Sequence, residues 1–384
     1  MFSKAQPGVE SMIYLLKDIK QSLHFWLLRR KADRREAVGP AEVMKEPVDF
    51  VVTWVDGSDP EWRAQKEEYE RKNGIFRSSR NNGEERYRDW DIFRYWFRAV
   101  EAYAPWVRTV YLVTCGHTPE WLNLSAPKLK VIRHSDYIPA EDLPTFNSVA
   151  IELNFHRIRE LSEHFVYFND DVFLMRPCRP EDFFREGMPN HCAVATPLRN
   201  PDNATFYHHQ FTALGAINRV FGGHVGEIVS AHPEKWFSRK YGNEMLYNKY
   251  AAQLDFLPGM FFSHLAVPMK KSTFENVWAE FPDLLRETSS HRFRKAEDVM
   301  HQIMSMWEIM NGDFYPASME HYGTVFSSPG SQIDALLDAV GGKKHLSICI
   351  NDSEYVSHEE YLKIRKVIRE KMEEAFPEKS SFEK

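Results

Sequence analysis

The feature that most constrains the fold is a series of short apolar, β-branched runs separated by segments with helical periodicity. The runs are DFVVTWV (49–55), RTVYLVT (108–114), KLKVIRH (128–134) and HFVYF (164–168), with helices expected over 61–73, 89–103 and 148–163. Such runs are too short for buried helices and suit buried strands. Strands that alternate with helices indicate a parallel or mostly parallel sheet with helices on both faces. The predicted class is therefore α/β.

The second half of the chain is mostly helical by the same criteria. We expect helices near 209–220, 271–286, 294–310, 331–340 and 357–376, with one late strand at 345–350. The predicted domains are an N-terminal helix and linker (1–46), a main domain (47–355) and a C-terminal helix (356–384). Within the main domain, 47–200 is strand-rich and 201–355 mostly helical.

Charge and cysteine content exclude several classes of protein. Lys and Arg number 49 against 55 Asp and Glu, which gives a net charge of −6 and no broad basic surface for nucleic acid. The 4 Cys are scattered without a CxxC pair, which argues against a disulfide framework or a structural zinc site. A reducing, cytoplasmic location is favoured.

The N-terminal segment 11–28 is apolar, but Lys17, Asp18 and Lys20 interrupt it, so neither a membrane span nor a signal peptide fits. Its apolar residues recur at helical spacing, and the basic stretch 29–35 follows. Such a helix suits peripheral contact of residues 11–35 with the anionic inner face of the cell membrane. Packing of the helix on its own domain or on a second subunit is the alternative.

Acidic turns follow the predicted strands. Asp56 and Asp59 follow the first strand, Asp170 and Asp171 follow the fourth, and Asn351-Asp352 follow the late one. Ligands of open α/β sheets bind beyond the carboxyl ends of the strands. Neighbouring carboxylates repel each other, and a hard cation such as Mg²⁺ or Mn²⁺ removes that repulsion. Asp170 and Asp171 are therefore candidate metal ligands.

Local structure offers an alternative for each of these features. Residues 169–171 also suit an Asx turn, and Asp59 before Pro60 suits a helix N-cap. Glu152 and His156 are four residues apart, which by spacing alone favours a solvated pair on one helix face. Arg292 and Arg294 lie at the start of a predicted helix, where they suit phosphate oxygens or a surface charge cluster.

Taken together, four blocks resemble the Stealth family of sugar-phosphate transferases. They are VDFVVTWVDGSDPEW (48–62), a long block from RYRDWDIF (86–93) to HFVYFNDDVF (164–173), HLAVPMKKSTFENV with TSSHRFRKAEDV (264–299), and ICIND (348–352). The family includes bacterial capsular polysaccharide phosphotransferases and the catalytic core of the animal N-acetylglucosamine-1-phosphotransferase. The resemblance implies a GT-A-like nucleotide-sugar transferase sheet with helical additions.

The resemblance also implies the reaction. A hexose 1-phosphate, for example N-acetylglucosamine 1-phosphate, would pass from a UDP-sugar to a hydroxyl of a saccharide acceptor. UMP would leave, and a phosphodiester would form in capsular or cell-surface polysaccharide. The rivals are a GT-A glycosyltransferase that releases UDP and a non-catalytic saccharide-binding protein, which the retained acidic and basic positions argue against. A homo-oligomer is also expected.

The family pattern places four residues at active-site positions: Glu152, Asp171, His264 and Arg294. Asp171 would serve as metal ligand or base with Asp170 in support. His264 would be the alternative base or a phosphate donor, and Arg294 with Arg292 would clamp the pyrophosphate. The expected substrate-binding residues are Thr53, Trp54, Asp56, Gly57, Asp59, Arg88, Asn147, Arg292, Asn351 and Asp352.

Overall fold

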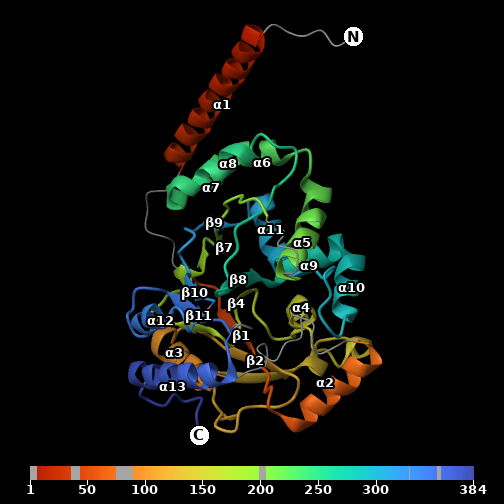
Figure 1. The fold of residues 1–384 in the computed structure, drawn as a ribbon, viewed down its shortest axis with the longest axis vertical. Coiled ribbons are helices and arrows are strands. Elements are labelled where there is room, and N and C mark those ends of the chain that lie inside the picture. The colour runs from red at the N-terminus through yellow and green to blue at the C-terminus, as the bar shows by residue number, and fades with distance from the viewer. Residues whose placement is uncertain (1–6, 36–43, 75–89, 199–204, 328, 353–355) are drawn as a thin grey trace.

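A computed structural model describes residues 7–35, 44–74, 90–198, 205–327, 329–352 and 356–384. Its central sheet has the strand order β3-β2-β1-β4-β8 (Figure 1). The strands are β1 (Val48–Thr53), β2 (Val110–Thr114), β3 (Leu129–Arg133), β4 (His164–Phe168) and β8 (Val267–Lys270). The first four are parallel, and β8 pairs antiparallel with β4. This mostly parallel sheet confirms the predicted α/β class, and the finer GT-A-like assignment stays a prediction.

Helices cover both faces of the sheet. Along β1, Phe50 and Val52 belong to one core, whereas Val51 between them belongs to the other, as the alternation of side chains in a strand requires. The first core receives α3 (Phe93–Tyr103), α12 (Ile333–Ala339) and α13 (His358–Ala375). The second receives α4 (Ser148–Leu153), α5 (Thr205–Phe221), α9 (Lys271–Glu280), α10 (Pro282–Ser290) and α11 (Gln302–Asn311).

The strand order contains a point of reversal. From β1 the chain continues through α2 (Pro60–Lys72) to β2 and β3 on one side, and then returns to form β4 on the other side of β1. Loops that leave the carboxyl ends of β1 and β4 consequently diverge. Ligand sites of open α/β sheets occur at such switch points.

Apart from β11, the strands of two small sheets were not predicted, and neither was β8 of the central sheet, because runs of two to four residues carry little periodicity. One has the order β10 (Gly323–Phe326), β11 (Ser347–Ile350), β5 (Val172–Leu174); the other has β6 (Phe184–Arg185), β7 (Met188–His191) and β9 (Tyr315–Pro316). The backbone N–H of Ile350 donates to the Asp171 carbonyl at 2.8 Å. The end of β11, the late strand predicted at 345–350, is thereby fixed beside the loop that follows β4.

Three predicted helices of the main domain differ from the observed bounds by more than four residues at one end. The one expected over 148–163 ends at Leu153, since the Asn154 side chain donates back to Ala150 O at 2.8 Å and a 3₁₀ turn, η4 (Phe155–Arg157), follows. The one expected over 271–286 is two helices, because Pro282 starts a new helix at α10. The one expected over 294–310 begins only at Gln302. The helices α6 (Val225–Ala231), α7 (Pro233–Trp236) and α8 (Met245–Ala251) were not predicted.

The N-terminal helix α1 (Pro7–Arg35) extends beyond the predicted 11–28 at both ends and projects from the body (Figure 1). Its C-terminal part packs on α7, with Leu28 and Ala32 buried and with ion pairs Arg35–Glu234 and Arg239–Asp33 at 3.4 and 2.9 Å. Within the described ranges, every helix is too short or too polar to cross a bilayer. The membrane or subunit contact, the location and the domain boundaries stay predictions.

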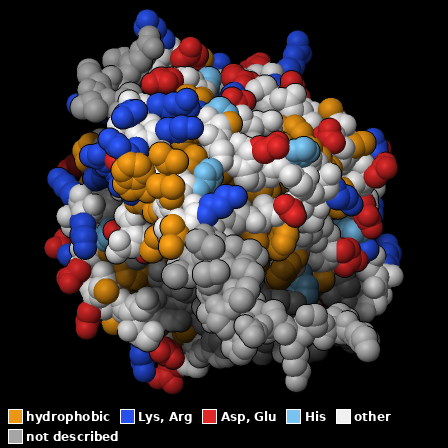
Figure 2. All heavy atoms as spheres, turned by 90° about the horizontal axis from the view of Figure 1, so that it is seen from above, with side chains coloured by type: hydrophobic (Ala, Val, Ile, Leu, Met, Phe, Trp, Pro, Cys, Tyr) orange, Lys and Arg blue, Asp and Glu red, His pale blue; other side chains and the backbone are white. Residues whose placement is uncertain are grey.

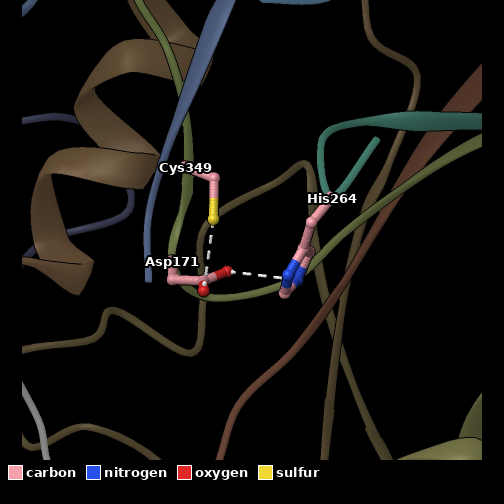
Figure 3. A group of neighbouring side chains, drawn as sticks. All are labelled: Asp171, His264 and Cys349. Atoms are coloured by element: carbon pink, nitrogen blue, oxygen red, sulfur yellow. Dashed lines mark hydrogen bonds and ion pairs between the residues drawn. The ribbon is translucent and has the colours of Figure 1, made fainter. Parts of the chain in front are cut away.

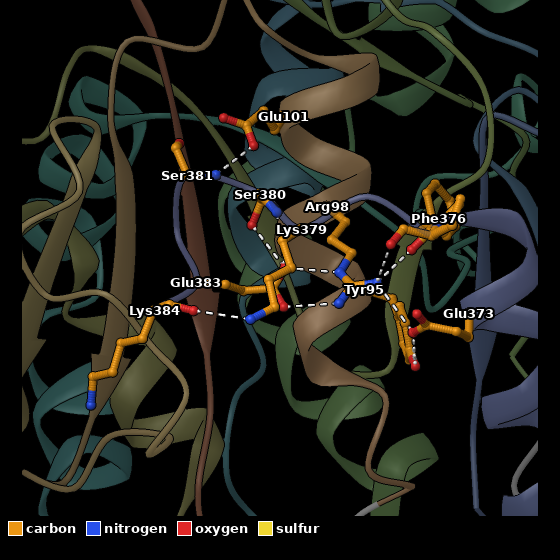
Figure 4. A network of polar contacts seen from close by, with 11 residues as sticks. Tyr95, Arg98, Glu101, Glu373, Phe376, Lys379, Ser380, Ser381, Glu383 and Lys384 are labelled. Atoms are coloured by element: carbon orange, nitrogen blue, oxygen red, sulfur yellow. Dashed lines mark hydrogen bonds and ion pairs between the residues drawn. The ribbon is translucent and has the colours of Figure 1, made fainter.

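A polar network fastens the C-terminal segment to α3 (Figure 4). Arg98, only 6% exposed, donates to both carboxylate oxygens of Glu383 at 2.8 and 3.0 Å and to Phe376 O at 2.6 Å. Burial raises the pKa of Glu383. The hydrogen bonds and charge of Arg98 lower it by a larger amount, so the net pKa lies below 4.5. The last residues of the chain are thus part of the same body as the sheet.

Candidate active site

A cavity of about 260 Å³ opens at the carboxyl ends of β1, β2 and β4, the predicted edge of the sheet. Eight of the predicted residues line it: Thr53, Trp54, Asp170, Asp171, His264, Arg294, Asn351 and Asp352. They come from the ends of β1, β4 and β11 and from loops before β8 and α11. The cavity therefore brings together segments about 300 residues apart along the chain.

Asp171 lies at the centre of this arrangement (Figure 3). Its Oδ2 accepts from the Cys349 thiol at 3.4 Å, and its Oδ1 lies 3.8 Å from His264 Nε2. A backbone bond from Val172 N to Asn169 O at 3.1 Å closes the turn. The Asp171 carboxylate points toward Cys349 and His264, so an Asx turn does not account for it.

One carboxylate oxygen of Asp171 is available to a cation. Asp171 Oδ1 is buried and has no hydrogen-bond partner within the described part of the chain. Asp171, His264 and Cys349 have ligand atoms within 4.8 Å of one another. Burial and the nearby Asp171 raise the pKa of Cys349 well above 9, so the thiol stays protonated and is a poor metal ligand. Carboxylate oxygens of Asp170 and Asp171 are the ligands that suit Mg²⁺ or Mn²⁺.

Glu152 lies behind the cavity wall, only 4% exposed, so the interpretation as a solvated pair with His156 is wrong. Its Oε2 accepts from His301 Nδ1 at 2.6 Å, and its Oε1 lies 3.1 Å from the Tyr167 hydroxyl. Burial raises the pKa of Glu152, but the charges of His301 and Arg294 and the hydrogen bonds lower it more, and the net pKa is below 4.5. Glu152 is therefore an ionised, buried carboxylate.

A path of hydrogen bonds connects this carboxylate to His264. The Tyr167 hydroxyl lies 2.6 Å from Asn169 Oδ1, and Asn169 Nδ2 lies 2.6 Å from His264 Nε2. Because the ionised Glu152 can only accept, it takes the single proton of the Tyr167 hydroxyl. We therefore assign the flipped Asn169 amide, whose nitrogen donates to the Tyr167 oxygen and whose oxygen accepts from His264 Nε2–H. Tyr167 and His301 were not predicted as site residues. Tyr167 lies two residues before Asn169, a spacing that could have indicated it, whereas nothing near His301 in the sequence does.

The two arginines of the basic segment separate. Arg294 lines the cavity, and its Nη2 donates to Ser148 Oγ at 2.5 Å. Arg292 instead donates to the carbonyl oxygens of Glu141 and Leu143, both at 3.1 Å. The predicted clamp thus has one arginine from this segment. Arg294 does not lie at a helix start, because Asp298 accepts from Lys295 N at 3.0 Å and holds 295–298 in a turn before α11.

The first acidic turn forms a helix cap. Asp59 Oδ1 accepts from Trp62 N at 2.7 Å at the start of α2, as the N-cap alternative predicts. Asp56 accepts from Ser58 N at 2.8 Å, and Gly57 O accepts from Arg63 Nε at 2.6 Å. As far as the described residues define the cavity, Asp56, Gly57 and Asp59 do not line it.

Two further predicted residues need separate placement. Asn147 is fully buried. It accepts from Val149 N at 3.2 Å as the cap of α4 and donates to Asp298 Oδ2 at 2.9 Å, so it supports the wall of the site. Among the described residues that line the cavity, Asn147 is absent. Arg88 lies outside the described residues.

Aromatic rings form the rest of the wall. Trp54 stacks on Phe93 with ring centroids 5.8 Å apart and planes at 1°. Phe146 meets Trp62 edge-on at 5.7 Å and stacks on Phe293 at 5.2 Å. Of these five residues, all but Phe293 line the cavity. Flat apolar rings beside carboxylates and a guanidinium suit a ligand with a ring and a charged group.

A mostly parallel α/β sheet with an acidic, arginine-bearing cavity at its switch point defines an α/β protein with a ligand site beyond the carboxyl ends of its strands. Models of conserved regions 1, 2 and 3 of Stealth proteins match residues 46–74, 86–191 and 263–322. The chain belongs to the Stealth family. Glu152 and Asp171 lie in the second matched region, and His264 and Arg294 in the third; the fourth block, 348–352, stays a prediction.

Curated relatives cover nearly the whole chain. The capsular polysaccharide phosphotransferase WcwK of Streptococcus pneumoniae is 41% identical over 89% of this chain and 100% of its own. The exopolysaccharide phosphotransferase cps2G of Lactiplantibacillus plantarum is 38% identical over 88% of this chain and 96% of its own. The receptor polysaccharide phosphotransferase WefC of Streptococcus gordonii is 36% identical over 88% of this chain and 100% of its own. A solved apo structure of the bifunctional glycosyltransferase WbbM covers 89% of this chain and 53% of its own, at 12% identity and a TM-score of 0.32.

Proposed function

We propose that this enzyme transfers a hexose 1-phosphate from a UDP-sugar to a hydroxyl of a saccharide acceptor, with release of UMP. The names of the relatives support sugar-phosphate transfer in capsular or cell-surface polysaccharide synthesis. The observation that carries the proposal is the single cavity in which Asp171, His264 and Arg294 converge. These are the groups that transfer of a phosphoryl group to a hydroxyl requires: a cation site, a proton acceptor and a guanidinium.

Charge development explains the two ends of the site. As the pyrophosphate bond breaks, negative charge grows on the phosphoryl oxygens and on the departing UMP. Arg294 presents a planar guanidinium to such oxygens, and Ser148 Oγ at 2.5 Å holds it in place. Asp170 and Asp171 would hold Mg²⁺ or Mn²⁺, which when bound supplies charge neutralisation at the phosphoryl oxygens.

The acceptor hydroxyl must lose a proton, and His264 is placed to accept it. Its side chain is 41% exposed, so an acceptor can reach it. The Asn169 amide oxygen accepts from Nε2–H, which orients the ring and leaves the lone pair of Nδ1 to accept the proton, while the Tyr167 hydroxyl connects Asn169 to the buried Glu152. Asp171, 3.8 Å from His264 Nε2, is the alternative base.

The released nucleotide separates this proposal from its rivals. Purified protein is incubated with a panel of UDP-sugars, a saccharide acceptor, and Mg²⁺ or Mn²⁺, and the nucleotide product is identified by chromatography. UMP supports phosphoryl transfer. UDP indicates a glycosyltransferase, and no donor turnover with saccharide binding retained indicates a binding protein; either would reject the proposal.

Isotope labelling identifies the broken bond directly. A donor carries ¹⁸O at the bridge between sugar C1 and the β-phosphorus. If the acceptor oxygen attacks that phosphorus, the C1–O bond survives, so the label appears in the phosphodiester and UMP stays unlabelled. A glycosyl transfer would leave the label in UDP instead.

A further inference from the structure

The outward face of α1 carries apolar side chains that the body does not cover. Four of them are about half exposed: Ile19 at 54%, Leu23 at 56%, Trp26 at 49% and Leu27 at 46%. The opposite face of the same helix packs on the body, where Leu28 is buried and Phe25 meets Phe237 at 5.4 Å. Since the helix already contributes one face to the core, the exposed stripe is a second apolar face with no role in that packing.

The same segment is strongly cationic on an acidic protein. Residues 19–35 contain six Lys or Arg and a single acidic residue, Asp33, while the whole chain has a net charge of −6. Asp33 is engaged by Arg239 at 2.9 Å. The Arg30 guanidinium lies 4.6 Å from the centre of the Trp26 ring, so charge and aromatic surface adjoin on the exposed face. Figure 2, which views this end of the molecule, shows hydrophobic side chains gathered beside Lys and Arg side chains.

Helix α8 extends this surface. Arg29 of α1 donates to the Met245 sulfur at the start of α8, and a cavity of about 400 Å³ between the two helices is lined by Lys20 and Lys249 among others. The exposed side chains of α8 are Leu246, Tyr247 and Tyr250, at 50, 44 and 64%. Two adjacent helices thus expose aliphatic and aromatic side chains next to cationic ones.

We propose that this surface, residues 19–35 with the exposed residues of α8, binds to the surface of an anionic lipid bilayer. Apolar side chains enter the boundary between headgroups and acyl chains, Trp and Tyr favour that boundary, and Lys and Arg attract anionic headgroups. A symmetric dimer through the same face would bring two cationic stripes together, which disfavours a second copy as the occupant. The inference goes beyond the proposed reaction, because none of the described residues of this surface lines the candidate active site and α1 projects from the body (Figure 1).

Vesicle flotation with the full chain tests the proposal. Vesicles of phosphatidylcholine alone are compared with vesicles that also contain phosphatidylglycerol. Binding is expected with the anionic vesicles and should weaken as salt is added. Arg30→Gln with Arg34→Gln, both exposed positions, should weaken binding about 30-fold, since each basic side chain contributes about 1 kcal/mol near such a surface.

The apolar contribution has its own variant and a matched control. Leu23→Glu with Trp26→Glu should abolish flotation, whereas Leu124→Glu with Leu362→Glu, exposed by 59 and 45% elsewhere on the protein, should leave it unchanged. None of the three double variants should change the melting temperature or the rate of transfer to a water-soluble acceptor. Unchanged values show that each variant is folded.

Two results would overturn the proposal. One is the absence of flotation of the full chain with anionic vesicles. The other is a dimer, measured by light scattering, that Leu23→Glu with Trp26→Glu converts to a monomer while vesicle binding is unaffected. The second result would assign the surface to another copy of the chain.

Discussion

Replacing Asp171 with Asn removes one negative charge from the candidate active site and keeps the size of the side chain. Asp171 Oδ1 is buried without a hydrogen-bond partner in the described structure, 3.8 Å from His264 Nε2. If this oxygen holds a cation or accepts a proton, the turnover number should fall at least about 100-fold, or about 2.7 kcal/mol in activation free energy. The free energy of unfolding should stay the same or rise by about 1 kcal/mol, because an amide is less costly than a charge with an unpaired oxygen in this position.

The assay measures UMP release at saturating donor over a range of Mg²⁺ concentrations, together with a thermal melt. A loss that high Mg²⁺ partly restores assigns Asp171 to the cation, whereas a loss at every Mg²⁺ concentration assigns it to the proton. Asp255→Asn, at an exposed position outside the cavity lining, is the matched control and should match the wild type. Turnover near that of the wild type in Asp171→Asn, with an unchanged melting curve, would refute the assignment.

The remaining predictions concern charge geometry, orientation, capping and acid stability. Arg294→Lys keeps the charge but loses the planar fork, so turnover should fall about tenfold or more in the UMP assay. Tyr167→Phe should lower kcat about tenfold with little change in donor KM, because the hydroxyl supports His264 only through Asn169. Asp59→Ala should lower the free energy of unfolding by about 1 kcal/mol in urea with kcat unchanged, as expected of a helix cap. Because the pKa of Glu383 is below 4.5, its bonds to Arg98 stabilise the fold above that pH and are lost as the pH falls through the folded value; Glu383→Gln should reduce this acid-dependent loss in melts at low pH.

The sheet could be predicted because buried parallel strands leave a strong local signal. HFVYF at 164–168 coincides with β4 at both ends, and the other three main strands differ by at most two residues at either end. The rule that ligands bind beyond strand ends then located Asp170, Asp171 and Asp352 correctly in one cavity. The same rule placed Asp59 there as well, because sequence does not distinguish a carboxylate that faces the cavity from one that turns back to cap α2.

Helix bounds and side-chain direction could not be predicted because tertiary contacts decide them. Asn154 ends α4 by a side-chain bond that competes with the helix, and Asp298 holds a turn where periodicity favoured a helix. Arg292 and Arg294 are two residues apart and equally basic. Arg292 nevertheless donates to the carbonyl oxygens of a neighbouring loop, whereas Arg294 lines the cavity. No local pattern separates them.

The position of Glu152 connects these results to the chemistry. Its carboxylate is buried behind the cavity wall and already bonded to His301 and Tyr167, so in this arrangement it does not touch a ligand in the cavity. If Glu152 has the active-site role that the resemblance implies, it therefore acts through its neighbours. The available path is Tyr167 to Asn169 to His264. We predict that Glu152 fixes the Tyr167 hydroxyl, which fixes the Asn169 amide and thereby the His264 ring. Glu152 and His301 are 149 residues apart along the chain, so this positioning device exists only once α4 and the loop before α11 have packed against β4.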